Sequence, residues 1–320
     1  MTPSASAPSP SLPAATTLGP VRLTVVDLAA TAAFYERVLG LRPLARDGEQ
    51  ATLGTAAGAA LVELVERADA APRPRRSSGL FHLALLLPSR ADLARSLRRV
   101  ALAGHPLQGA SDHLVSEALY LADPEGNGIE LYRDRPRAEW GRERDGQIRM
   151  ATLPLDLDDL IAELPDGLAA EAPDAPEAPD APDAGVPDGA RIGHVHLQVA
   201  DLERAEAFYH RLLGFDVVVR GYPGALFVSA GGYHHHLGLN TWASRDGAPN
   251  APGVRGLDRF TVALPDRTAL DAVAARLAAA GVATAAHDGA LLVADPFGNE
   301  LALTSAAAAR SGAAGAGAPR

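Results

Sequence analysis

The chain contains no cysteine, which excludes disulfides, thiolate catalysis and thiolate metal ligands and fits a reducing compartment. Aromatic residues make up only 5% of the chain, so Ala, Leu and Val must supply most of the core. No apolar stretch reaches the ~20 residues that a membrane-spanning helix needs. The first 17 residues lack the basic cluster and apolar run of a secretory signal. A cytoplasmic protein is therefore expected.

The chain has few basic residues relative to acidic ones, with 29 Lys and Arg against 39 Asp and Glu and a formal net charge of −10. This balance argues against nucleic acid or an anionic membrane as the main partner. A hydrophobic content of 47% and a charged content of 21% are typical of globular proteins. A length of 320 residues suggests about two domains.

Three segments have compositions that do not support a packed core. Residues 1–17 are rich in Pro, Ser and Ala, and residues 306–320 are rich in Ala and Gly, so both are expected to be disordered. Residues 165–189 alternate Asp, Pro and Ala and predict an acidic, extended linker. The linker divides the chain into a first domain, residues 18–150, and a second, residues 190–305.

The two halves repeat one another. Residues 192–215 match residues 18–41 at a constant offset of 174, and both contain a Phe-Tyr pair and a Leu-Gly pair. Residues 256–267 match residues 79–90, and residues 294–303 match residues 122–131. The chain therefore holds four copies of a unit with one strand, one helix and three further strands, and it belongs to the α+β class. We call residues 18–71, 79–135, 190–243 and 256–305 modules one to four. A charged arm with Trp140 follows module two.

The end of module two contains several residues whose side chains could bind a metal or transfer protons. Residues 118–122 and 129–132 read as two strands joined by an Asp-Pro-Glu-Gly-Asn-Gly turn, whose Pro and Gly residues suit a hairpin loop. Because side chains alternate along a strand, Tyr120 and Glu130 can face one interior, and His113 lies close in sequence. Carboxylate and imidazole suit a divalent metal, and phenol with a second imidazole suits proton transfer. Taken alone, the segment also fits an ordinary hairpin with one exposed Glu.

Four such units, with an Asp-Leu, Phe-Tyr, Leu-Gly opening and an Asp-Pro-x-Gly-Asn closing hairpin, resemble the vicinal oxygen chelate superfamily. This superfamily includes glyoxalases, bleomycin-resistance proteins and extradiol ring-cleaving dioxygenases. The resemblance implies that two modules face each other and that their sheets curve around a metal. It also implies that the ligands come from the first and last strands of a module.

The repeat identifies which modules retain ligands. The first-strand position lies seven residues before Asp27, Ser89, Asp201 or Asp266 and holds Pro20, His82, His194 and Arg259 in the four modules. The last-strand position holds Glu130 in module two and Ala302 in module four. The resemblance therefore implies a metal bound by His82, His194 and Glu130. Two His and one carboxylate are associated with Fe(II), and Mn(II) is the alternative metal.

These ligands have a structural consequence, because they come from modules two and three on opposite sides of the linker. If modules one and two closed on each other, His82 and Glu130 would lack the second His. We therefore expect two barrels, one formed by modules two and three and the other by modules one and four.

The remaining site residues are assigned from the likeness to extradiol dioxygenases. Their Tyr lies ten residues before the ligand Glu, which is Tyr120 here, and His113 fits their upstream His. Their acid–base His corresponds to His235 in a strand expected at residues 233–242. Alternation predicts that His235 faces opposite to its two neighbours, although a surface cluster is a second interpretation. Five further residues are expected either behind the ligands or in the substrate pocket: His196, His234, His236, Asn240 and Trp242.

The expected function is extradiol ring cleavage, in which O2 is inserted into a small catechol-type diol next to its hydroxyls. One alternative is a glyoxalase-like isomerase or lyase, but such enzymes use two Glu among four ligands, and module three offers His instead. A second alternative is a non-enzymatic drug-binding protein, which usually has two modules and needs no metal. A homo-oligomer is compatible with all three.

Overall fold

The computed structural model describes residues 10–164 and 185–305. Modules one and two each contain the expected strand, helix and three strands. Module one contains β1 (Thr17–Val25), α1 (Leu28–Arg37), β2 (Arg42–Asp47), β3 (Gln50–Gly54) and β4 (Ala60–Glu66). Module two contains β5 (Gly79–Leu87), α2 (Arg90–Leu102), β6 (Gly109–Asp112), β7 (Ser116–Ala122) and β8 (Gly128–Asp134). The arm after module two contains η1 (Arg137–Glu139), β9 (Leu153–Pro154) and α3 (Leu157–Ile161).

The second half repeats this order, with one change in the helix of module three. That helix begins as α-helix and continues as π-helix. Module three contains β10 (Arg191–Gln198), α4 (Leu202–Glu206), the π-helix η2 (Ala207–Leu213), β11 (Asp216–Val219), β12 (Ala225–Ser229) and β13 (Leu237–Asn240). Module four contains β14 (Gly256–Leu264), α5 (Arg267–Ala279), β15 (Thr284–His287), β16 (Ala290–Ala294) and β17 (Glu300–Ser305).

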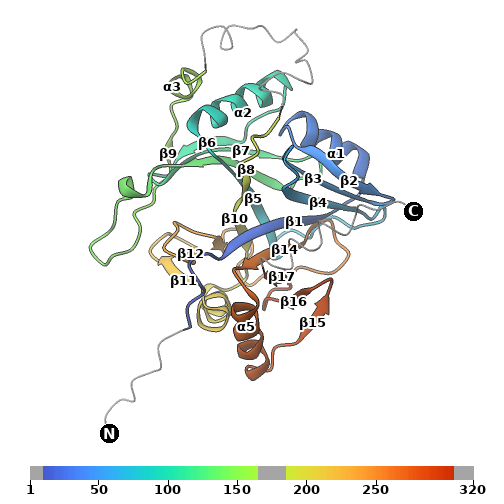
Figure 1. Ribbon diagram of the computed structural model, residues 1–320, viewed down its shortest axis with the longest axis vertical. Coiled ribbons are helices and arrows are strands. Elements are labelled where there is room, and N and C mark those ends of the chain that lie inside the picture. Colours follow the sequence, from blue (N-terminus) through green and yellow to red (C-terminus); the bar gives the residue numbers. More distant parts are fainter. Residues whose placement is uncertain (1–9, 165–184, 306–320) are drawn as a thin grey trace.

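The strands form two curved sheets, and each sheet joins two modules from different halves of the chain (Figure 1). The eight-stranded sheet has the order β15-β16-β17-β14-β1-β4-β3-β2 and unites modules one and four. The nine-stranded sheet has the order β11-β12-β13-β10-β5-β8-β7-β6-β9 and unites modules two and three. The joining pairs, β1 with β14 and β5 with β10, are antiparallel. The expected α+β fold with crossed pairing is therefore confirmed.

Alternation along the strands separates a leucine-rich face of the nine-stranded sheet from a polar one. In β5, Leu83, Leu85 and Leu87 join the main core, whereas Ala84 and Leu86 belong to a different buried cluster on the opposite face. The leucine-rich face packs under α2, which lies over β6, β7 and β8 in Figure 1. The other face carries His82 and Glu130. Burial of leucine on one side thus fixes which side chains face the interior of the barrel.

The residues that mark each repeat in the sequence cap its helix. Asp27, Ser89, Asp201 and Asp266 each accept a hydrogen bond from the backbone N–H three residues later. Such a side-chain cap stabilises a helix by ~1 kcal/mol, because it satisfies an N–H group that has no partner inside the helix. The first strand of each module must therefore end at a fixed distance from its helix, which keeps the ligand positions in register.

The N-terminal segment differs from the expectation. Leu12 is buried, its N–H donates to the carbonyl of Gly214, and β1 already begins at Thr17. The prediction of disorder up to residue 17 is therefore wrong for residues 10–17, because an apolar side chain packs against module three. The rest of this prediction falls on residues 1–9, most of the linker on residues 165–184, and the tail on residues 306–320. These three segments lie outside the described residues. The end of the linker packs on module one, since the N–H of Val186 donates to Gly40.

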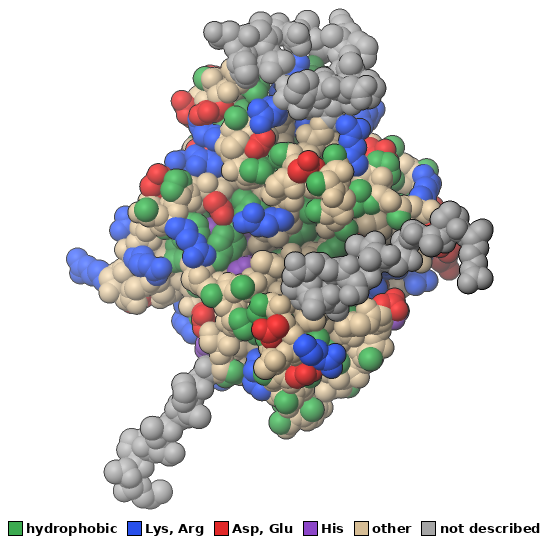
Figure 2. Space-filling model, in the orientation of Figure 1, with side chains coloured by type: hydrophobic (Ala, Val, Ile, Leu, Met, Phe, Trp, Pro, Cys, Tyr) green, Lys and Arg blue, Asp and Glu red, His purple; other side chains and the backbone are tan. Residues whose placement is uncertain are grey.

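The surface mixes charges of both signs. Figure 2 shows acidic, basic and apolar side chains interspersed over the face that it draws, and no field of one sign covers the described part of that face. None of the helices in the described ranges combines the length and apolar character that crossing a membrane requires.

A buried Tyr–Asp hydrogen bond ties the modules together within each half. The hydroxyl of Tyr35 in module one donates to Asp123 in the closing turn of module two, and Tyr209 in module three donates to Asp295 in module four. Each Asp also accepts backbone N–H groups of its own turn. The Tyr of each Phe-Tyr motif thus donates a hydrogen bond to the Asp of an Asp-Pro-x-Gly-Asn motif.

We expect Asp295→Ala to lower the free energy of unfolding by about 3 kcal/mol, because it leaves several buried donors without an acceptor. Tyr209→Phe, which removes only the hydroxyl, should cost about 1 kcal/mol. Urea unfolding followed by circular dichroism measures both values. Asp271→Ala is the control, since the Asp271 side chain is exposed and its ion pair with Arg267 is worth ~0.5 kcal/mol. A loss for Asp295→Ala no larger than that of the control would contradict the structural role.

Candidate metal centre and active-site cavity

The polar face of the nine-stranded sheet surrounds a cavity of about 300 Å³. Its floor is formed by side chains of three adjacent strands, β5, β8 and β10. Its walls are largely aromatic and come from Phe81, Tyr120, Tyr222, Phe227 and Trp242. Phe81 and Trp242 are 38% and 49% exposed, which places them at the mouth of the cavity.

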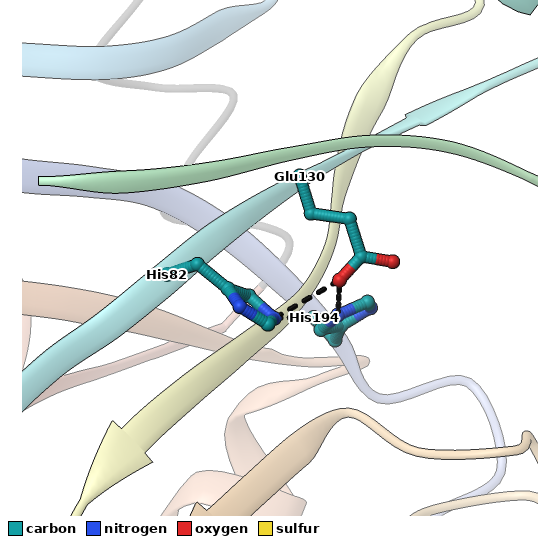
Figure 3. Close-up of side chains that lie close together, drawn as sticks. All are labelled: His82, Glu130 and His194. Atoms are coloured by element: carbon teal, nitrogen blue, oxygen red, sulfur yellow. Dashed lines mark hydrogen bonds and ion pairs between the residues drawn. The ribbon is translucent and has the colours of Figure 1, made fainter. Parts of the chain in front are cut away.

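Three candidate ligands converge on this floor (Figure 3). His82 lies on β5, Glu130 on β8 and His194 on β10, and all three side chains are buried. Glu130 Oε2 is 3.0 Å from Nε2 of His82 and 3.0 Å from Nε2 of His194. The two Nε2 atoms are 3.3 Å apart. No second cluster of three such ligands occurs within residues 10–164 and 185–305.

The spacing of the three ligand atoms fits one divalent metal. Ligand bonds of about 2.1 Å at right angles place the ligand atoms about 3.0 Å from one another, as on one face of an octahedron. The tetrahedral angle corresponds to about 3.4 Å, close to the 3.3 Å between the two Nε2 atoms, so the three distances lie between the two geometries. One feature departs from usual metal sites, because Nδ1 of His194 is buried without a hydrogen-bond partner among the described residues. The donor set nevertheless suits a metal that keeps open positions on the cavity side.

The electrostatics of the cluster also favour a cation. Burial raises the pKa of Glu130, but the charge and hydrogen bonds of His194 and His82 outweigh this effect and hold the pKa well below its usual value. Burial lowers the pKa of His194 to about 4, against the opposing effect of Glu130. At neutral pH the cluster therefore contains an ionised carboxylate beside a neutral imidazole, which are the forms that bind a metal.

The positions in the eight-stranded sheet that correspond to the three ligands hold Pro20, Arg259 and Ala302, and ion pairs lie on the same and neighbouring strands. Arg22 contacts both Glu63 and Asp258, and Arg259 lies 3.8 Å from Glu300. These guanidinium groups supply a positive charge next to the carboxylates. The prediction that modules one and four have lost their ligands agrees with this arrangement.

Tyr120 and His113 form a hydrogen-bonded pair beside the cluster. Tyr120 is the cross-strand partner of Glu130, and its hydroxyl lies 2.6 Å from Nε2 of His113. Nδ1 of His113 lies 2.6 Å from the carbonyl of Ala151, which can only accept a hydrogen bond. In a neutral imidazole this leaves Nε2 as the acceptor, so Tyr120 donates to His113. Burial, and then the charge of Glu130, raise the pKa of Tyr120 well above its usual value and keep the hydroxyl protonated.

His235 reaches the cavity from module three. Its ring centre is 4.2 Å from that of His194, and it lines the cavity wall opposite Tyr120. Burial, and then the neighbouring imidazoles, lower the pKa of His235 well below its usual value, so the ring is neutral. The expected strand at residues 233–242 is shorter, since β13 begins only at Leu237. Strand alternation therefore does not govern the three His, and each side chain takes its own direction.

The structure separates the other predicted residues into two groups. His196 and Trp242 line the cavity, whereas His234, His236 and Asn240 do not. His234 lies behind His235, with its Nδ1 2.8 Å from Nδ1 of that residue. His236 bonds to Ser229 and lines a separate, smaller cavity, so its assignment to the substrate pocket is wrong. Asn240 is fully buried, and its side-chain oxygen accepts the N–H of Trp242.

Several cavity residues carry no signal that sequence reasoning could use. Phe81, Tyr222, Phe227 and Met150 line the walls, but they come from four different segments. Phe81 alone stands next to a predicted ligand, His82. The others are brought in by sheet curvature and by the arm after module two.

Comparisons with known proteins agree with the fold and with the repeat. The sequence profile of the Glyoxalase/Bleomycin resistance protein/Dioxygenase superfamily matches residues 17–131 and 191–303. Catechol-2,3-dioxygenase from Bacillus subtilis (strain 168) is 42% identical over 284 residues, which cover 88% of this chain and 94% of that protein.

Solved structures show the same architecture at low sequence identity. A putative dioxygenase from Bacillus subtilis has a TM-score of 0.59 at 13% identity, with 90% of this chain and 84% of that chain covered. Glyoxalase I from Zea mays has a TM-score of 0.55 at 17% identity, with 93% and 95% covered. Together with the match over both halves and the 42% identical relative, these likenesses lead to one conclusion: the chain belongs to the Glyoxalase/Bleomycin resistance protein/Dioxygenase superfamily.

Proposed function

We propose that this chain is a metal-dependent extradiol dioxygenase, which uses O2 to open a catechol-type ring next to its two hydroxyls. The observation that carries the proposal is the His82, Glu130 and His194 cluster, which faces a cavity with His235 on one side and Tyr120 on the other. The 42% identical relative is a catechol-2,3-dioxygenase, which supports the same chemistry.

Fe(II) is the proposed metal, with Mn(II) as the alternative, because two imidazoles and one carboxylate suit both ions. When bound, the metal would take both diol oxygens, promote their ionisation and provide a site for O2. The three side chains would hold it through Nε2 of His82, Nε2 of His194 and Oε2 of Glu130. This leaves the cavity side free for substrate.

Proton transfer is assigned to His235 and Tyr120. His235 is neutral and borders the cavity, so its imidazole can take a proton from a diol hydroxyl and return it later in the reaction. Tyr120 keeps its hydroxyl proton, which it donates to His113. When a diol binds, the hydroxyl can turn from His113 and offer the same proton as a hydrogen bond to an oxygen atom of the reacting ligand.

The cavity walls favour an uncharged diol. Among the described residues that line it, Glu130 is the only one that carries a formal charge at neutral pH apart from any charged His. A carboxylate on the substrate ring would find no Arg or Lys along these walls, and an unpaired buried charge is costly. The aromatic rings of Phe81, Phe227 and Trp242 instead offer surfaces for an apolar ring.

A glyoxalase-like reaction is disfavoured by the composition of the cluster. That alternative expects a second carboxylate from module three, but His235 is the group that module three places next to His194. The likeness to glyoxalase I concerns the fold alone. A purely sequestering role leaves the buried cluster without a purpose. A cytoplasmic location and a homo-oligomer remain predictions.

We expect each of His82→Ala, Glu130→Ala and His194→Ala to lose stoichiometric metal, because two remaining ligands hold a divalent ion poorly. Metal content after anaerobic purification, measured by mass spectrometry, checks this. His287→Ala is the matched control, since its side chain is half exposed on β15, far from the cavity. Full metal retention in all three variants would contradict the assignment.

The acid–base residues should affect turnover rather than metal binding. We expect His235→Ala and Tyr120→Phe to keep metal and catechol binding but to lower kcat by ~10²–10⁴-fold, the usual contribution of a general acid or base. His113→Ala should act more mildly and mainly raise KM, because it acts through Tyr120. Absorbance of the yellow ring-opened product measures turnover. Parental rates in both His235→Ala and Tyr120→Phe would remove the acid–base assignment.

Substrate charge provides a separate test. We expect kcat/KM for 4-methylcatechol to exceed that for 3,4-dihydroxybenzoate by about 100-fold, since the carboxylate would be buried without a cationic partner. The two compounds have similar size, so steric fit is controlled. Steady-state kinetics on both compounds gives the ratio. Equal values would show that the walls do not select against charge.

A further inference from the structure

A chain of polar contacts extends behind His235, away from the cavity. Nδ1 of His235 lies 2.8 Å from Nδ1 of His234, and Nε2 of His234 lies 2.8 Å from Oδ1 of Asp134. Asp134 is the last residue of β8, the strand that carries Glu130. Because alternate residues share a face of a strand, β8 presents both the candidate metal ligand and this carboxylate to the same side.

The chemistry of the three groups fixes the direction of each hydrogen bond. An ionised carboxylate can only accept, so Nε2–H of His234 donates to Asp134. In a neutral His234, Nδ1 then has a lone pair and must accept from Nδ1–H of His235. A neutral His235 with a hydrogen on Nδ1 has its lone pair on Nε2.

We propose that Asp134 and His234 are positioning residues that hold His235 in the tautomer with a free Nε2 lone pair. The inference rests on the proposed function, in which His235 exchanges protons with the diol. A diol proton then moves to Nε2, and the resulting imidazolium keeps its Nδ1–H on His234. The positive charge on His235 is then separated from the carboxylate of Asp134 only by the ring of His234. Return of the same proton restores the starting tautomer, so no other reactant is needed.

The opposite arrangement requires a doubly protonated His234. Its Nδ1–H would then donate to Nδ1 of His235, and the hydrogen of His235 would lie on Nε2, where it prevents base action. That arrangement would set a cationic ring against a metal held by His194, since the ring centres of His234 and His194 lie 6.2 Å apart.

Packing holds the chain of contacts in place. The hydroxyl of Tyr233 donates to Oδ1 of Asp134 at 3.2 Å, and Tyr132 and Tyr233 share a hydrogen bond of 2.8 Å. Trp140, from the arm after module two, covers Tyr233 and His234 with ring centres 5.9 and 5.3 Å apart. Water is thereby kept from His234, so the arm after module two covers this part of the site.

The tautomer can be read directly by nitrogen NMR of ¹⁵N-histidine-labelled protein loaded with Zn(II), a diamagnetic metal. The spectrum of His235→Gln identifies the signals of His235. We expect the Nδ1–H form of His235 in the parent protein and a shift toward the Nε2–H form in Asp134→Leu, which lacks the acceptor. An Nε2–H form in the parent protein overturns the proposal, even if the variant does not fold.

Turnover supplies the second readout. We expect Asp134→Leu to lower kcat by about 10- to 100-fold, the usual effect of losing a supporting hydrogen bond, with KM for catechol and metal content unchanged. His236→Gln is the control at a neighbouring imidazole, whose ring bonds to Ser229 and lies outside the cavity. Its kcat and the tautomer of His235 should equal those of the parent protein.

Two results separate this inference from the proposed function. If Asp134→Leu keeps both the parental tautomer and the parental kcat, the positioning role is wrong while ring cleavage stands. If the parent protein opens no catechol ring, the proposed function fails, although the NMR comparison still reports whether Asp134 sets the tautomer of His235.

Discussion

The antiparallel pairing of β5 with β10 is the constraint on which the site depends. It joins modules two and three, and it is the reason that His82 and His194, 112 residues apart in the chain, come within 3.3 Å of each other. In its register His82 lies opposite His196 and His194 lies opposite Ala84, so His82 and His194 are diagonal neighbours. Both imidazoles therefore point to the same face, where Glu130 of the parallel neighbour β8 completes the cluster.

Burial then decides the charge state of the cluster. One carboxylate stands among several imidazoles in an interior that disfavours positive charge, and burial lowers the pKa of His194, His196 and His235. The site is thus prepared for an external cation rather than for protons. The same lack of charge along the cavity walls limits the ring substituents that the proposed enzyme can accept.

Two different connections hold the four modules together. The sheets join modules one with four and two with three, whereas the Tyr35–Asp123 and Tyr209–Asp295 hydrogen bonds join one with two and three with four. Neither half of the chain can therefore complete a barrel alone. The eight-stranded sheet holds Pro20, Arg259 and Ala302 at the positions of the three ligands and carries ion pairs such as Arg22–Glu63 nearby. It supports the site without duplicating it.

Local periodicity in the sequence by itself determined the modules, and the resemblance to the superfamily then indicated which position of each module could hold a ligand. The repeat defined four modules, the helix caps at Asp27, Ser89, Asp201 and Asp266 fixed the strand register, and counting from them found His82 and His194. Crossed pairing could be predicted because the candidate ligands were divided between the halves. Only the tertiary structure decided the directions of His234, His235 and His236, which precede β13 and escape its alternation. It also decided the packing of Leu12 and the contact of Asp134 with His234, because these depend on segments far apart in the chain whose approach is set by sheet curvature.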